Sequence, residues 1–172
     1  MTVLVYVFLS LAATGLVALL IVHVAALFGV IYPFEHSIKF LVPGLFGVWF
    51  PTILVMNRLT RDFKQKDIWR AALRGCPKWL QRSQYILLGY TWIGFFALPV
   101  IYGGGMELPI NKVRSISGGM LAFYSIAASV LFSATRAAKF DESRRCLNAH
   151  RVSPLAKFCD ECGAPAESSN VK

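Results

Sequence analysis

Four long apolar runs limit what this chain can fold into more than any other feature. They cover about residues 3–32, 40–56, 85–102 and 116–135. A water-soluble core cannot absorb several such blocks, whereas a helix that crosses a bilayer needs about 20 apolar residues. The chain is also only 16% charged, below the roughly one quarter of soluble domains. We therefore expect an all-α membrane protein with four transmembrane helices in a domain spanning residues 1–135.

A basic segment between the second and third runs predicts the orientation of the chain. It covers residues 58–82 and reads RLTRDFKQKDIWRAALRGCPKWLQR. In the other short loops between apolar runs, the only basic residues are Lys39, Lys112 and Arg114. Cytoplasmic loops of membrane proteins collect Lys and Arg. We therefore expect loop 57–84 and both termini on the cytoplasmic side of the membrane.

The same segment is predicted to lie at the membrane interface. A short helix there has an apolar face with Trp69 and Leu73 and a cationic face with Arg70 and Arg74. Such helices lie among lipid head groups, where Trp is also enriched. A docking surface for a partner protein is the alternative. The residues expected to contact lipid are Arg58, Arg61, Lys64, Lys66, Trp69, Arg70, Arg74, Lys78, Trp79 and Arg82.

Two polar features inside the apolar runs need an explanation. His23 is the only titratable side chain deep in the first run, and such a residue is costly in hydrocarbon unless it is paired. We expect a neutral imidazole bonded to a Ser, Thr or Tyr of a neighbouring helix, with a proton or metal role as the alternative. A stripe in the fourth run is predicted to pack helices together or to line a polar path. It consists of Gly118, Ala122, Ser125, Ser129 and Ser133.

The carboxyl-terminal part carries two pairs of metal-ligand residues. Cys146 and His150 form a Cys-x3-His pair, and Cys159 and Cys162 form a Cys-x2-Cys pair. Zinc prefers thiolate and imidazole ligands, and four of them complete a tetrahedron. We predict a structural zinc ribbon over residues 146–167, after a helical linker (136–145) and before a disordered tail (168–172). A Cys-x-x-Cys redox pair is the alternative, but it needs a βαβ context and leaves the first pair unexplained.

These residues resemble the short zinc ribbons found at the ends of bacterial proteins. The stretch NAHRVSPLAKFCDECGAPA stands where that family has an Asn-Gly-His, a Ser-Pro and a Phe-Cys-x-x-Cys-Gly. Leu147 replaces the proline that usually follows the first cysteine, and Val152 and Phe158 are the expected apolar cover of the site. The preceding part is similar to uncharacterised bacterial multi-pass membrane proteins around ALRGCPKWLQ and GGMLAFYSIAASVLFSA. The two resemblances imply that the membrane is a bacterial inner membrane.

The expected function is non-enzymatic, because the apolar runs hold no carboxylate and no pair of nucleophile and base. Nucleic acid is not an expected partner: between Cys146 and Glu167 two basic residues face three acidic ones, whereas phosphate contacts need clustered Lys and Arg. We therefore expect membrane lipids and a cytoplasmic protein as partners, with the ribbon as the docking element. A small transporter or channel that uses His23 and the serine stripe, in a homo-oligomer, is the alternative.

Overall fold

The named elements of the structure are all helical. The computed structural model describes residues 2–30, 32–61, 63, 65–101, 109–140, 146–148, 150, 152, 157–159 and 161–165. Within these ranges there is no β-strand, and the all-α prediction is confirmed. The elements are α1 (Thr2–Leu27), α2 (Tyr32–Thr60), the 3-10 helix η1 (Gln65–Asp67), α3 (Ile68–Ala72), α4 (Lys78–Ile101) and α5 (Pro109–Phe140).

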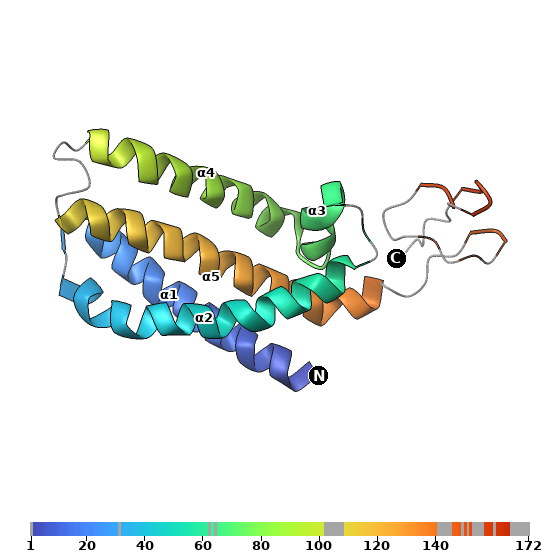
Figure 1. Cartoon of the computed structure of the whole chain (residues 1–172), viewed down its shortest axis with the longest axis horizontal. Coiled ribbons are helices and arrows are strands. Elements are labelled where there is room, and N and C mark those ends of the chain that lie inside the picture. The colour runs from blue at the N-terminus through green and yellow to red at the C-terminus, as the bar shows by residue number, and fades with distance from the viewer. Residues whose placement is uncertain are drawn as a thin grey trace.

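The four long helices lie side by side and alternate in direction (Figure 1). Helices α2 and α5 run one way, and α1 and α4 run the other way. One end of the bundle therefore gathers the start of α1, the end of α2, all of α3, the start of α4 and the end of α5. This is the end at which the carboxyl-terminal Cys/His residues follow α5.

Helix α5 is the centre of the bundle. Of its apolar segment 72% is buried, against 22% for α1 and 11% for α2. One buried cluster joins it to α1 and α2, and it includes Leu19, Val48 and Leu131. A second cluster joins it to α2 and α3 near the end that carries the basic segment, and it includes Leu59 and Val130. Every other long helix therefore packs on α5.

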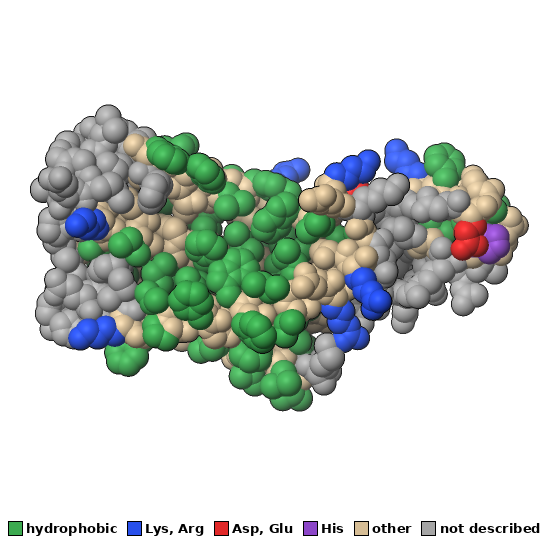
Figure 2. All heavy atoms as spheres, viewed as in Figure 1, with side chains coloured by type: hydrophobic (Ala, Val, Ile, Leu, Met, Phe, Trp, Pro, Cys, Tyr) green, Lys and Arg blue, Asp and Glu red, His purple; other side chains and the backbone are tan. Residues whose placement is uncertain are grey.

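Within the described residues, three helices are long and apolar enough to cross a membrane. Their apolar segments are Val3–Leu27, Lys39–Thr60 and Ile110–Arg136. Large apolar side chains are exposed along the middle of the bundle, including Phe46, Ile86 and Trp92. Figure 2 shows hydrophobic side chains gathered over that middle section on the face in view. Such a surface fits the hydrocarbon of a bilayer, since soluble monomers rarely expose large contiguous apolar patches.

The first two helices begin and end at different residues from those predicted. Helix α1 ends at Leu27, not near residue 32, because Gly29 has a φ of 87° and closes the helix. The N–H groups of Gly29 and Val30 donate to the carbonyls of Ala26 and Ala25, which is a Schellman ending. Helix α2 then starts at Tyr32, so the loop expected at 33–39 is helical. A proline in a first turn, here Pro33, costs no backbone hydrogen bond.

The later boundaries also differ from the prediction. The predicted loop 57–84 is mostly helical, because α2 extends to Thr60 and α4 already starts at Lys78. Helix α5 starts at Pro109, where a proline is again favourable, and continues to Phe140. The predicted helical linker is therefore helical through residue 140. Its remainder, 141–145, and the predicted disordered tail, 168–172, lie outside the described residues.

Candidate metal centre

The first pair of ligands is presented by a short turn. The N–H of Cys146 donates to the carbonyl of His150 at 3.1 Å, so the backbone folds back on itself within the Cys-x3-His motif. The side chain of Cys146 is buried, and that of His150 is half-buried. The turn therefore directs both side chains to the same side.

A tighter turn presents the second pair. The N–H of Gly163 donates to the carbonyl of Cys159 at 2.9 Å, and the N–H of Cys159 donates to the carbonyl of Ala164 at 2.8 Å. Gly163 has a φ of 69°, a left-handed conformation that glycine adopts without strain. This conformation explains why glycine follows Cys162 directly.

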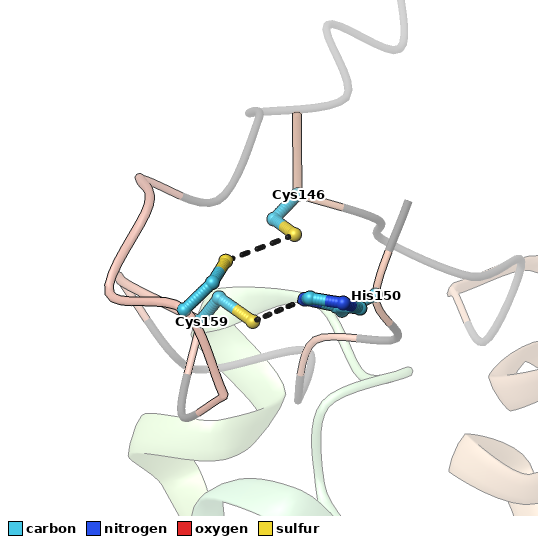
Figure 3. Close-up of side chains that lie close together, drawn as sticks. Cys146, His150 and Cys159 are labelled. Carbon is cyan, nitrogen blue, oxygen red and sulfur yellow. Dashed lines mark hydrogen bonds between the residues drawn. The ribbon is translucent and has the colours of Figure 1, made fainter. Parts of the chain in front are cut away.

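The two turns bring all four predicted ligands together. Their ligand atoms lie within 4.8 Å of one another, and the side chains of Cys146, Cys159 and His150 point toward a common centre (Figure 3). The sulfurs of Cys146 and Cys162 are 3.6 Å apart, and the Cys159 sulfur is 3.8 Å from His150 Nδ1. The residues therefore form a group that can hold a metal ion.

These distances fit a tetrahedral metal and exclude a disulfide. Ligands at about 2.3 Å (sulfur) and about 2.0 Å (nitrogen) from a tetrahedral zinc lie about 3.8 Å (S to S) and about 3.6 Å (S to N) apart. The observed separations agree within a few tenths of an ångström. A disulfide needs about 2.05 Å, and all four cysteines are free. The arrangement is consistent with zinc, as the spacing predicted.

The surroundings favour metal binding over free thiols. The N–H of Ala164 lowers the pKa of the Cys162 thiol and so favours the thiolate that a metal requires. Burial raises the pKa of the Cys146 thiol, so a cation beside it would favour its thiolate form. A Glu161 carboxylate oxygen lies 3.7 Å from His150 Nδ1. The donor set of three thiols and one imidazole leaves a four-coordinate ion no open position for water.

Only one of the two apolar side chains expected to cover this site is buried. Val152 packs with Cys146 and Cys159 and is buried. Phe158 instead exposes 59% of its surface, and Leu147 exposes 70%. Phe158 pairs through its backbone with Pro165, which holds it at the rim of the turn. The expectation that Phe158 covers the ligands is therefore wrong.

The basic segment is docked on the bundle through its apolar side. Ala71, Ala72 and Leu73 of this segment are buried, whereas Trp69 remains exposed. Leu73, which was expected to enter the membrane interface, packs against α2 and α5 instead. The Arg74 guanidinium donates to the Leu59 carbonyl at 3.1 Å and lies 5.1 Å from the centre of the Phe63 ring.

The remaining predicted lipid contacts are exposed, apart from Lys64, which lies outside the described residues. These exposed side chains are Arg58, Arg61, Lys66, Trp69, Arg70, Lys78, Trp79 and Arg82.

His23 has hydroxyl partners on two neighbouring helices. Its Nδ1 lies 2.8 Å from Ser117 Oγ of α5, and its Nε2 lies 2.6 Å from the Tyr90 hydroxyl of α4. The Ser117 hydroxyl donates to the Val113 carbonyl, so its oxygen is left to accept a hydrogen bond from Nδ1–H. Nε2 then accepts from Tyr90, and a neutral imidazole is fully satisfied.

The serines of the α5 stripe form hydrogen bonds with residues of neighbouring segments. The Gln84 side-chain amide donates to Ser125 and Ser129 at 2.9 and 3.0 Å. The Ser133 hydroxyl accepts the N–H of Gly75 at 3.0 Å. Of the two interpretations of this stripe, the described residues favour packing.

Together, the fold and the site define a helical protein whose described part has three membrane-length apolar helices and a carboxyl-terminal Cys/His group that could hold a metal ion. Comparison of the chain with protein-family models, with curated proteins and with solved structures finds no match. The assignment of a function therefore depends on the chemistry of the residues themselves.

Proposed function

We propose that this protein is a non-enzymatic integral membrane protein that displays a cytoplasmic, zinc-stabilised ribbon for the docking of a protein partner. The observation that carries the proposal is the meeting of four ligand atoms within 4.8 Å, just past the end of the central helix. Three thiolates and one imidazole form a donor set that suits zinc. The closed coordination assigns the ion a structural role, because a catalytic zinc needs an open position.

In this proposal α4 is a fourth membrane span. It has 24 residues and lies beside α5 in the bundle. It begins with Lys78 and Arg82, which belong at the head-group level, and its apolar part follows them. Four alternating crossings then place the basic segment and both termini in the cytoplasm of a bacterial cell by the positive-inside rule. A reducing compartment also keeps the cysteines available as ligands.

Docking is supported by the surface beside the ligands. Leu147 and Phe158 each adjoin a cysteine ligand, and both are large apolar side chains that remain exposed. Aromatic side chains such as Phe are enriched in the cores of protein interfaces, and an exposed leucine adds apolar contact area. A metal ion would hold these two side chains in place, because a module of this size cannot bury enough core to fold unaided.

The transporter or channel alternative has less support. Its two sequence features, His23 and the serine stripe, are engaged in hydrogen bonds between helices. A polar path would require hydroxyl groups directed to water rather than to Gln84 and Gly75.

Site-specific photo-crosslinking in intact membranes tests the proposal. A photoreactive amino acid replaces Phe158, and the captured protein is identified by mass spectrometry. We expect one protein whose capture is lost when Cys159→Ser and Cys162→Ser remove the metal. In an affinity pull-down, Leu147→Ser with Phe158→Ser should also lose this protein but keep one metal ion per chain.

Lys157→Ala is the matched control, because Lys157 is exposed and adjoins Phe158 without being a ligand or an apolar side chain. It should retain both metal and partner. Capture that persists without the metal would contradict the docking role, and purified protein without bound zinc would contradict the metal assignment.

A further inference from the structure

Exposed basic side chains surround one end of the bundle. They come from the end of α2, from η1 and α3, from the start of α4 and from the end of α5, and Figure 2 shows Lys and Arg between the apolar middle section and the carboxyl-terminal part. We call this set the basic collar. It consists of Arg58, Arg61, Lys66, Arg70, Lys78, Arg82 and Arg136.

Among the residues that the structure describes, the collar has little opposing charge, and the backbone beneath it is held in place. Asp67 is the only carboxylate among the described residues of this end. The backbone beneath the collar is fixed to α5, because the Gly75 N–H donates to Ser133 Oγ and the Cys76 thiol donates to the Ser129 carbonyl. The cations of η1 and α3 are therefore held at one level next to the apolar surface.

Two tryptophans mark that level as the edge of the hydrocarbon. Trp79 exposes 70% of its surface and Trp69 exposes 40%, and both lie in the sequence between collar residues. Trp side chains collect where hydrocarbon meets head groups. Cations at the same level face phosphate groups, to which juxtamembrane Lys and Arg are attracted.

We infer that the basic collar binds the phosphate groups of anionic phospholipids in the leaflet that it faces. Lipid is favoured over a nucleic acid or an acidic protein, because the collar is continuous with the exposed apolar side chains of the bundle. The inference goes beyond the docking proposal and is independent of the metal, since no collar residue is a ligand.

The opposite end of the bundle provides a natural control. Lys39 and Lys112 are the exposed cations of the described part there. Arg114 is engaged, because its guanidinium donates to the carbonyls of Ala26 and Leu27 at the end of α1. The inferred lipid preference should therefore belong to one leaflet only.

Lipid retention on the full-length protein measures this preference. The protein is reconstituted in nanodiscs of equal parts phosphatidylcholine and phosphatidylglycerol, then extracted in mild detergent, and the bound lipid is quantified by mass spectrometry. We expect enrichment of phosphatidylglycerol over the bulk mixture. High salt during extraction should reduce the enrichment, because exposed charges are screened.

The collar variant combines Lys66→Gln, Arg70→Gln, Lys78→Gln and Arg82→Gln, and it leaves Arg74 in place because that side chain bonds Leu59. Each lost cation should weaken anionic-lipid binding about fivefold. The control, Lys39→Gln with Lys112→Gln, should keep the enrichment. Unchanged helix content and metal content will show that both proteins are folded.

Any one of the following results would overturn the inference. The collar variant could retain phosphatidylglycerol as well as the native protein does, or the control could lose it equally. The native protein could instead bind an RNA oligonucleotide when it is in neutral nanodiscs, and this binding could be tighter than its binding of phosphatidylglycerol in the mixed nanodiscs. If the collar variant does not fold, the salt dependence of the native protein decides, and enrichment that high salt leaves unchanged would refute the inference.

Discussion

The Tyr90 hydroxyl lies 2.6 Å from Nε2 of His23, and this hydrogen bond connects α4 directly to α1. Both helices otherwise pack on α5, to which His23 is also bonded through Ser117. One buried imidazole therefore joins three helices at a single point. Residues of this kind stabilise a membrane bundle because an unpaired polar group in hydrocarbon is costly.

A double-mutant cycle should detect this connection. His23→Leu and Tyr90→Phe each remove the bond, so their combined effect on the free energy of unfolding should be smaller than the sum. We expect a coupling energy of about 1 kcal/mol, typical of hydrogen bonds within membranes. Reversible unfolding in mixed micelles measures it. Strictly additive effects would show that the bond does not contribute to stability.

The hydrogen bonds around His23 also predict its tautomer. Because the Ser117 hydroxyl donates to Val113, the proton of the neutral ring should be on Nδ1. Nitrogen chemical shifts of labelled histidine in reconstituted protein distinguish the two neutral forms. A proton on Nε2, or a charged ring at neutral pH, would contradict this prediction and would favour the transporter alternative.

Gly75→Ala should destabilise the protein. A Cβ at this position would lie 2.5 Å from the Ser133 carbonyl oxygen and 2.9 Å from its Cα, and both are backbone atoms that cannot move alone. We expect a loss of about 1–3 kcal/mol, as for other overpacked sites. Thermal unfolding in detergent measures it. Gly89→Ala is the matched control, since a Cβ at Gly89 would have no neighbour within 4 Å, and an equal loss there would refute the packing explanation.

Cys76 should be the slowest thiol to react. Its side chain is buried and donates to the Ser129 carbonyl, and burial raises the pKa of the thiol to about 11. The thiolate is the reactive form, so alkylation of the folded protein should accelerate about tenfold per pH unit up to that pKa. Mass spectrometry after timed alkylation measures the rates. Rapid labelling of Cys76 at neutral pH, with the helices intact, would contradict the docked position of this segment.

Metal removal should affect the carboxyl-terminal part and leave the bundle folded. A chelator should expose Cys146, Cys159 and Cys162 to alkylation and make residues 146–167 sensitive to protease, because metal binding supplies the folding free energy of so small a module. The far-ultraviolet signal of the helices should barely change. Refilling with cobalt should give the absorption of a tetrahedral thiolate site, and a spectrum of an octahedral ion would contradict the assigned ligands.

The Cys/His group could be predicted from the sequence because its signal is local. Two residues in a Cys-x2-Cys or Cys-x3-His motif are presented by one turn, so spacing alone indicates the site. The all-helical fold follows in the same way from the length of the apolar runs. By contrast, the partners of His23 depend on which helices are neighbours, and periodicity does not specify this. The residue type of the partner was expected, but Tyr90 and Ser117 could not be named.

The docked position of α3 shows a second limit of the sequence. Its apolar side chains fit a membrane interface and a protein core equally well, and the choice is made by the close approach of Gly75 to Ser133. Small residues permit such approaches without marking where they occur. The exposure of Phe158 escaped prediction for a related reason, because an aromatic residue beside a ligand can either cover the ion or stand at the rim.

The central place of α5 has a mechanical consequence. The helix that precedes the carboxyl-terminal Cys/His group in the chain is also the helix on which α1, α2 and α4 pack. A force exerted by a protein bound at this group would therefore be distributed over all four long helices, rather than separating one outer helix from the others.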